Sequence, residues 1–143
     1  ISLRRDHPVL RRPLFLHGNK ISQGTRLRDI DWISPGGGAL SDAYWQDPKA
    51  RCFGMVLAGD AGDYFTPDGY PETDDTLLII FNAGPSPLPF RMPAAANAHQ
   101  WRCLLDTAHP RLAAGWLVGP AGDNFQMDAW AVTVFGLAAN DNR

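Results

Sequence analysis

Acidic side chains are the first candidates for chemistry, because a retaining glycosidase needs two facing carboxyl groups, one of them kept protonated. The chain has 15 acidic residues, but Glu72 is its single glutamate. Glu72 lies in the segment DGYPETDD, whose charge and proline content is typical of a solvated loop. An acid catalyst needs a carboxyl group whose pKa is raised by burial, and a carboxyl group in a solvated loop lacks that burial. We therefore expect no catalytic residue on this chain.

The histidines do not form a metal-binding pattern. They are His7, His17, His99 and His109. No two have the i,i+4 spacing of a helical zinc motif or the i,i+2 spacing of a strand, and no cysteine adds a cluster. The aspartates of the loop at residues 59–74 lack the spacing and the terminal glutamate of a calcium loop. We therefore expect no metal site and no cofactor.

No nucleophile stands in a recognisable setting either. The chain has no Gly-x-Ser-x-Gly elbow, and the glycine run PGGGAL at residues 35–40 lacks the lysine and the long helix of a phosphate-binding loop. That run is expected to be a turn. Cys52 and Cys103 fall in apolar, strand-like segments and are expected to be buried free thiols, with a disulfide between them left open.

Aromatic side chains remain as candidates for stacking on sugar rings. Trp32, Trp101 and Trp130 lie in alternating, strand-like segments, which favours the core of a sandwich. Trp45 follows the glycine run, where it would either plug the edge of the core or face a neighbouring domain. The candidate carbohydrate-binding residues are Trp45, Tyr64, Phe65 and Tyr70.

The elements that would position these residues are mostly short strands. With 14 glycines and 12 prolines the chain is rich in turns, and turn-linked strands favour antiparallel pairing. A helix is expected to end near His7, and a helical turn capped by Ser41 is expected at 41–47. Strands are expected at 26–34, 51–58, 75–83 (central), 88–92, 100–106, 116–118 and 125–137 (one strand or two). The predicted fold is an all-β, antiparallel β-sandwich of about seven to eight strands with a short N-terminal helix stub.

Charge and hydropathy exclude two classes of partner. The net charge is −2 and the basic residues are scattered, so we expect no nucleic-acid binding. The longest apolar stretch, residues 130–139, is too short to span a bilayer, and the N-terminus has no signal-peptide core. No membrane association is expected, and the predicted location is the cytoplasm.

Residues 29–60, DIDWISPGGGALSDAYWQDPKARCFGMVLAGD, resemble a block of the isoamylase-type glycogen debranching enzymes of the α-amylase family. The matching residues are Asp29, Ile30, Trp32, Pro35, Gly37, Trp45, Pro48, Ala50, Arg51 and Gly54. Residues 74–93 and the segment WRCLLDTAHP resemble later blocks, and LRRDHPVLRR resembles the last helix of the catalytic barrel. Gly36, Leu40, Tyr44 and Phe53 depart from the pattern, which leaves a trehalose-pathway relative as an open subfamily.

The resemblance implies a larger glycoside hydrolase that cleaves α-1,6-glucosidic branch linkages of glycogen or limit dextrin. Residues 1–18 would end the barrel helix and link it to a C-terminal sandwich at 19–143. This non-catalytic domain would pack against and stabilise the (β/α)8 barrel of the same polypeptide, which carries the catalytic carboxylates. The expected interface residues are Leu3, Val9, Leu10 and Trp45. The alternative is a free-standing or appended carbohydrate-binding module, with an α-glucan as partner.

Overall fold

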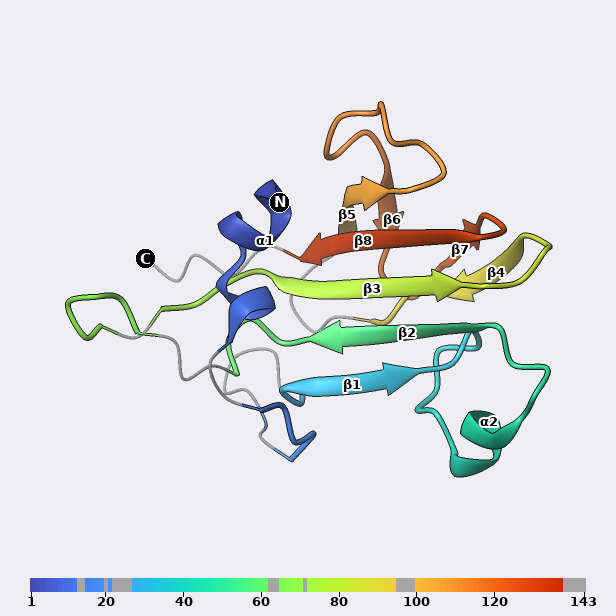
Figure 1. The fold of residues 1–143 in the computed structure, drawn as a ribbon, viewed down its shortest axis with the longest axis horizontal. Helices are drawn as coiled ribbons and strands as arrows, with labels where there is room; N and C mark the ends of the chain where they lie inside the picture. The colour runs from blue at the N-terminus through green and yellow to red at the C-terminus, as the bar shows by residue number, and fades with distance from the viewer. Residues whose placement is uncertain are drawn as a thin grey trace.

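The computed structural model describes residues 1–12, 15–19, 21, 27–61, 65–70, 72–94 and 100–137, and the structural statements below concern these residues. Eight strands dominate them (Figure 1). The strands are β1 (Ile30–Ile33), β2 (Cys52–Leu57), β3 (Thr76–Asn82), β4 (Leu88–Arg91), β5 (Gln100–Asp106), β6 (Val118–Pro120), β7 (Asn124–Met127) and β8 (Ala131–Leu137). The helical segments are α1 (Ser2–Asp6), the 3₁₀ helix η1 (Pro8–Arg11) and α2 (Asp42–Gln46). The predicted all-β class and the N-terminal helix stub are confirmed.

The strands form two antiparallel sheets. The larger has the order β1-β2-β3-β8-β5-β6, and β4 pairs with β7 in the smaller. The apolar segment TLLIIFN forms β3 between β2 and β8, so its predicted central position is confirmed. Strand β8 pairs with β3 along its whole length and with β5 on its other side, and therefore joins the two halves of the sheet.

The main hydrophobic cluster lies between the two sheets. It combines inward residues of the large sheet, such as Ile80, with Phe90 of β4 and Met127 of β7. Trp101 is fully buried there, as predicted, and its indole N–H donates to the carbonyl of Pro93 at 3.0 Å. The one polar atom of this large side chain is thus satisfied inside the core.

Gly54 of β2 determines how closely the sheets approach each other. A Cβ at this position would lie 2.6 Å from Cζ of Phe90 and 2.9 Å from Cγ1 of Ile33. The missing side chain therefore lets the ring of Phe90 rest directly on the β2 backbone.

The glycine run is a turn that leads into α2. Gly37 has a φ of 90°, in the left-handed region that favours glycine. Ser41 caps α2 by accepting the N–H of Tyr44 at its Oγ (3.2 Å), and the Tyr44 hydroxyl donates to the carbonyl of Cys52. The predicted turn and cap are confirmed, and together they fix the position of Trp45 beside β2.

Two of the three tryptophans predicted for the core lie elsewhere. Trp130 is 70% exposed and Trp32 is 37% exposed. Trp130 lies in the turn before β8, with a φ of 52° and its N–H bound to the carbonyl of Gly84. Trp32 lies on the outer side of β1 because Ile33 occupies the inner side, where it joins the core.

Two of the predicted strands have different boundaries in the structure. Residues 125–137 form two strands, β7 and β8, which belong to different sheets. The strand predicted at 116–118 is β6, shifted toward the C-terminus. Cys52 and Cys103 are buried free thiols, as expected, and burial raises the pKa of each to about 11.

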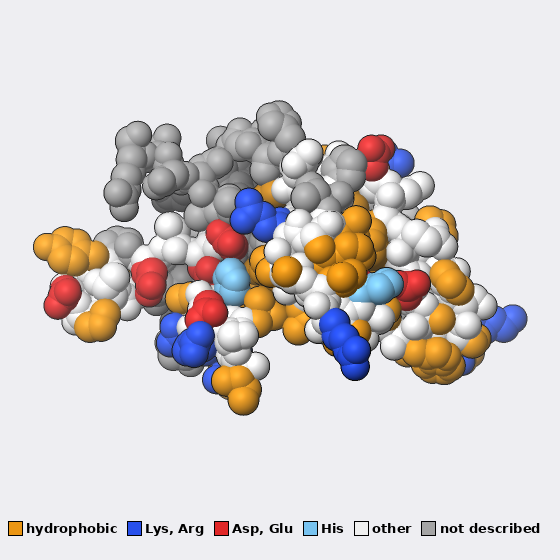
Figure 2. Space-filling model, turned by 90° about the horizontal axis from the view of Figure 1, so that it is seen from above, with side chains coloured by type: hydrophobic (Ala, Val, Ile, Leu, Met, Phe, Trp, Pro, Cys, Tyr) orange, Lys and Arg blue, Asp and Glu red, His pale blue; other side chains and the backbone are white. Residues whose placement is uncertain are grey.

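Charged side chains form small separate groups over the face in Figure 2, with hydrophobic side chains exposed between them. No helix within the described residues is long and apolar enough to cross a membrane.

Candidate docking face

The outer face of the large sheet, opposite the β4-β7 sheet, is also apolar. Alternate residues of β3 divide between the two sides: Leu78 and Ile80 join the inner cluster, while Leu77, Ile79 and Phe81 belong to an outer one. A sheet that is apolar on both faces needs cover on both, so the outer face requires a second layer.

The N-terminal segment supplies part of that layer. Figure 1 shows α1 and the following 3₁₀ turn at the left end of the large sheet, near the start of β3 and the end of β8. Val9, only 3% exposed, packs with Leu57 and Leu77, and Leu3 and Leu10 pack against the same cluster. Three of the four predicted interface residues thus contact the sheet of their own chain.

A buried carboxylate holds this segment in place. Asp74 accepts the N–H of Val9 at Oδ2 (2.9 Å), and its Oδ1 lies 2.9 Å from Nδ1 of His7. The N–H of Asp75 also donates to Oδ1, at 2.7 Å. Because a buried carboxylate is stable only with such partners, Asp74 and the segment that follows α1 depend on each other. The division of the chain at residue 18 stays a prediction.

A second buried carboxylate lies at the start of β1. Asp29 is 1% exposed. Burial acts to raise its pKa, but N–H donors of His17, Ile30 and Gly18 and the guanidinium of Arg12 act in the opposite direction. The balance holds the pKa of Asp29 below its ordinary value, so these N–H groups and the guanidinium stabilise an ionised carboxylate here.

Beyond the N-terminal segment, the outer face carries four aromatic side chains, which we call the aromatic patch: Trp32, Trp45, Phe53 and Phe81. Trp32 and Trp45 meet edge to face with ring centroids 5.4 Å apart, and Phe53 lies within 5.8 Å of both. Phe53 stacks on Phe81 at 5.0 Å. These rings form one continuous apolar surface across β1, β2, β3 and α2.

The aromatic patch is open to solvent. Trp45 is 51% exposed and Trp32 is 37% exposed, while the two phenylalanines are partly buried. A cleft of about 410 Å³ lies beside the two tryptophans, and Arg28 and Asp31 are among its polar lining residues. Of the four predicted interface residues, Trp45 is the one that the structure leaves uncovered.

The structure does not bring the predicted carbohydrate-binding residues together. Phe65 and Tyr70 are 62% and 71% exposed. They belong to the segment 65–70, which forms the loop at the left edge of Figure 1, whereas α2, which carries Trp45, lies at the opposite end of the sheet. Tyr64 lies outside the described residues.

Sequence reasoning missed most of the patch. The sequence pattern predicts Trp32 in the core, marks Phe53 only as a departure from the family block, and does not single out Phe81. One part of the signal was local: Phe81 follows the inward-facing Ile80 in β3, so it must point to the other side of the sheet. Its pairing with Phe53 comes from the register of β2 with β3. The sequence pattern alone does not show which of the two apolar faces of the large sheet remains exposed to solvent.

The two sheets define an antiparallel β-sandwich domain, with one closed core and one partly open outer face. The family model described as "Isoamylase, C-terminal" matches residues 29–138, and the chain belongs to this family.

Curated relatives support the assignment. The chain is 37% identical over 111 residues to a "Glycogen operon protein GlgX homolog" of Mycobacterium tuberculosis, a match that covers 76% of this chain and 15% of the relative. The homologue of the same name from Mycobacterium bovis matches with the same identity and the same coverage. An "Isoamylase" of Pseudomonas amyloderamosa is 22% identical over 124 residues, covering 86% of this chain and 14% of the relative. The chain therefore spans a small fraction of the length of these relatives.

Proposed function

We propose that this chain is the non-catalytic C-terminal domain of a debranching enzyme and that it packs against the catalytic barrel of the same polypeptide through the aromatic patch. The parent enzyme would hydrolyse α-1,6-glucosidic branch linkages of glycogen or limit dextrin, with its catalytic carboxylates on the barrel. The cytoplasm is the proposed location, by analogy with glycogen metabolism.

The observation that carries this proposal is the unequal covering of one apolar face. At one end α1 and η1 bury Leu57 and Leu77, whereas at the other end Trp32 and Trp45 remain exposed. Exposed apolar surface that continues directly from a buried cluster is typical of a contact with another domain. The matched relatives contain several times more chain than this domain, so such a partner is expected in the same polypeptide.

The test uses the full-length polypeptide that contains this domain. Trp45→Arg, alone and combined with Trp32→Arg, places charge in the aromatic patch, and Phe65→Arg is the matched control because Phe65 is 62% exposed in a distant loop. We expect the patch variants to lower the unfolding temperature of the full enzyme and to make the junction sensitive to protease. Patch variants that match the Phe65 variant in both assays would overturn the proposal.

The cleft beside Trp32 and Trp45 favours a second candidate, the binding of an α-glucan. Exposed indole rings next to a carboxylate and a guanidinium suit a sugar ring, which has an apolar face and a rim of hydroxyl groups. Titration of the chain with maltoheptaose, followed by tryptophan fluorescence, tests this candidate. We expect Trp45→Ala to abolish the signal and Tyr70→Ala to leave it unchanged; an unchanged signal from the wild-type chain at millimolar sugar excludes the candidate.

A further inference from the structure

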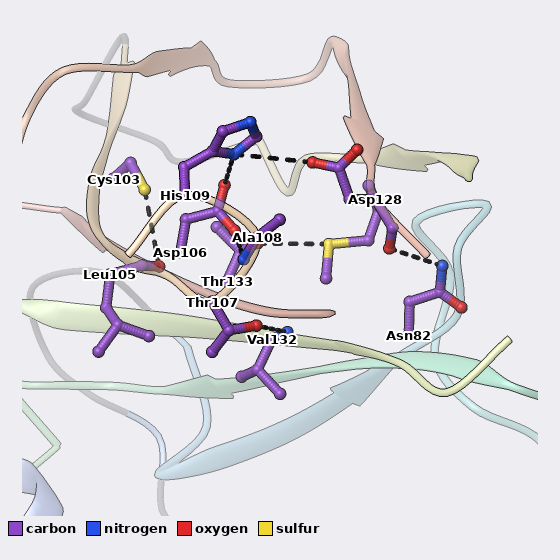
Figure 3. Close-up of polar contacts among 11 residues, drawn as sticks. Asn82, Cys103, Leu105, Asp106, Thr107, Ala108, His109, Asp128, Val132 and Thr133 are labelled. Atoms are coloured by element: carbon purple, nitrogen blue, oxygen red, sulfur yellow. Dashed lines mark hydrogen bonds and ion pairs between the residues drawn. The ribbon is translucent and has the colours of Figure 1, made fainter. Parts of the chain in front are cut away.

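Away from the aromatic patch, the fold brings one imidazole between two carboxylates. His109 follows β5, Asp106 is the last residue of that strand, and Asp128 lies between β7 and β8 (Figure 3). Nδ1 of His109 lies 3.0 Å from Oδ2 of Asp106 and 3.8 Å from Oδ2 of Asp128. One ligand atom from each residue lies within 4.8 Å of the other two.

Hydrogen bonds hold two of these residues in position. The carboxylate of Asp106 accepts the N–H of Ala108 at 2.9 Å, so its other oxygen is turned toward His109. The carbonyl of Asp128 accepts Nδ2–H of Asn82 at 2.9 Å, which ties the β7-β8 turn to β3. The ring of Trp116 packs against that of His109, with the two ring centroids 5.3 Å apart.

The turn between these residues is also anchored. The N–H of Thr107 donates to the carbonyl of Val132 (3.0 Å), and its Oγ1 accepts the N–H of the same residue (2.9 Å). The donor atoms therefore come from segments held by the sheet rather than from free loops, as a preformed ion site requires.

The cluster contains two carboxylates but a single imidazole, so its negative charges outnumber the positive charge that His109 could carry. The Asp106 side chain is 3% exposed, so its carboxylate is removed from water and needs a cationic or hydrogen-bonding partner. Nδ1 of His109 carries at most one proton, which cannot be donated fully to both carboxylates at once. A divalent cation in place of that proton would interact with both carboxylates and with the imidazole nitrogen.

The distances suit a small cation. Bonds of about 2.0–2.2 Å from zinc to nitrogen and oxygen place the ligand atoms of a tetrahedral site about 3.3–3.6 Å apart. The two distances from Nδ1, 3.0 and 3.8 Å, lie on either side of this range. The Asp128 side chain is 44% exposed, so it has room to close on the ion, and the ion has a path from solvent.

We propose that Asp106, His109 and Asp128 bind one divalent transition-metal cation of the zinc type, with water completing the coordination. An imidazole ligand distinguishes this set from the all-oxygen sites that magnesium and calcium prefer. The ion would link the end of β5 in the large sheet to the end of β7 in the small sheet. Its role is therefore structural, as a clamp between the two sheets.

The test measures metal binding by the 143-residue chain after removal of metal with a chelator. Zn²⁺ is titrated calorimetrically, and Co²⁺ is titrated by its visible absorption, which reports coordination geometry. We expect one ion per chain and a higher unfolding temperature with Zn²⁺ than without it. Absence of saturable one-to-one binding overturns the proposal.

Two variants locate the ion. His109→Gln keeps a hydrogen-bond donor for buried Asp106 but removes the imidazole ligand, and Asp128→Asn removes a partly exposed carboxylate. We expect each to weaken Zn²⁺ binding by about 100-fold or more, since even residues behind the ligands are worth about 10–100-fold. His17→Ala removes an exposed imidazole elsewhere and should leave binding unchanged. Binding that survives in both ligand variants, or that is lost in the His17 variant, places the ion elsewhere and refutes the assignment.

Discussion

The close approach of the two sheets at Gly54 gives a sharp test of the packing. Replacing Gly54 by alanine adds a Cβ that would lie 2.6 Å from Cζ of Phe90 and 2.9 Å from Cγ1 of Ile33. Ordinary contact begins at 3.4 Å, so the Phe90 ring must withdraw by about 0.8 Å. Phe90 is fully buried, and it cannot move without disturbing the core around it.

Two effects of opposite sign set the magnitude. Overpacking of this kind destabilises by about 1–3 kcal/mol, while loss of glycine entropy in the unfolded chain returns about 0.4–1 kcal/mol. We expect Gly54→Ala to lower the free energy of unfolding by about 1–2 kcal/mol. For a chain of this length, that corresponds to an unfolding temperature about 3–7 °C lower.

Thermal and urea unfolding, followed by circular dichroism, measure the change. Gly38→Ala is the matched control, because a Cβ at Gly38 meets no atom within 4 Å and should leave stability unchanged or slightly higher. Phe90→Leu shortens the clashing ring, so the Gly54→Ala/Phe90→Leu pair should lose less stability than the two single changes together. If Gly54→Ala unfolds at the same temperature as Gly38→Ala, the argument that this glycine sets the sheet separation is wrong.

Three further predictions concern buried groups. Iodoacetamide at mildly alkaline pH should leave Cys52 and Cys103 unmodified in the folded chain, because both are buried and their pKa is raised to about 11, whereas urea should expose both to labelling. Asp74→Ala should remove the acceptor of the Val9 N–H, lower the free energy of unfolding by about 1–3 kcal/mol and speed hydrogen exchange in η1. Asp29 has a folded pKa below its ordinary value, so its stabilising contribution is present above the unfolded pKa of about 3.9 and is lost as the pH falls through the folded value. Asp29→Asn should therefore flatten the acid limb of the stability profile.

Asp68 provides the control for both aspartate variants, since it is exposed in the loop that carries Tyr70. Asp68→Ala and Asp68→Asn should leave unfolding and its pH dependence unchanged. Equal exchange rates in η1 for the wild type and Asp74→Ala would contradict the anchoring role. An unaltered acid limb in Asp29→Asn would contradict the lowered pKa, and labelling of either cysteine without denaturant would contradict its burial.

The sequence correctly predicted those features of the fold that depend only on residues close together in the chain. The apolar run of β3 gave a central strand, and Ser41 gave the N-cap of α2, because a strand pattern and a cap are both local properties. The fate of Trp130 was missed because β8 begins one residue later, and that turn conformation depends on a contact with Gly84. A local pattern does not reveal such a contact.

The candidate sites depend on tertiary pairing to a larger degree. His109 looked isolated because its partner Asp128 lies on another turn, which approaches only when β5 and β7 take their places in different sheets. Asp29 lies in a segment predicted to be a strand, but nothing in that segment marks it as buried; it is buried because the segment at His17 folds over it. In each case the residue type was visible in the sequence, whereas its partner was set by the fold.

The place of β8 has a consequence for the synthesis of the protein. This strand comes last among the described strands, yet it stands in the middle of the large sheet, and β3 and β5 are both hydrogen-bonded to it. While the chain emerges from the ribosome, β1, β2 and β3 can pair with one another, but the edges of β3 and β5 stay open until residues 131–137 arrive. Exposed edges of this kind invite pairing with other chains. The domain is thus exposed to such pairing from the synthesis of β3 until β8 emerges, and its sheet closes only in a late step.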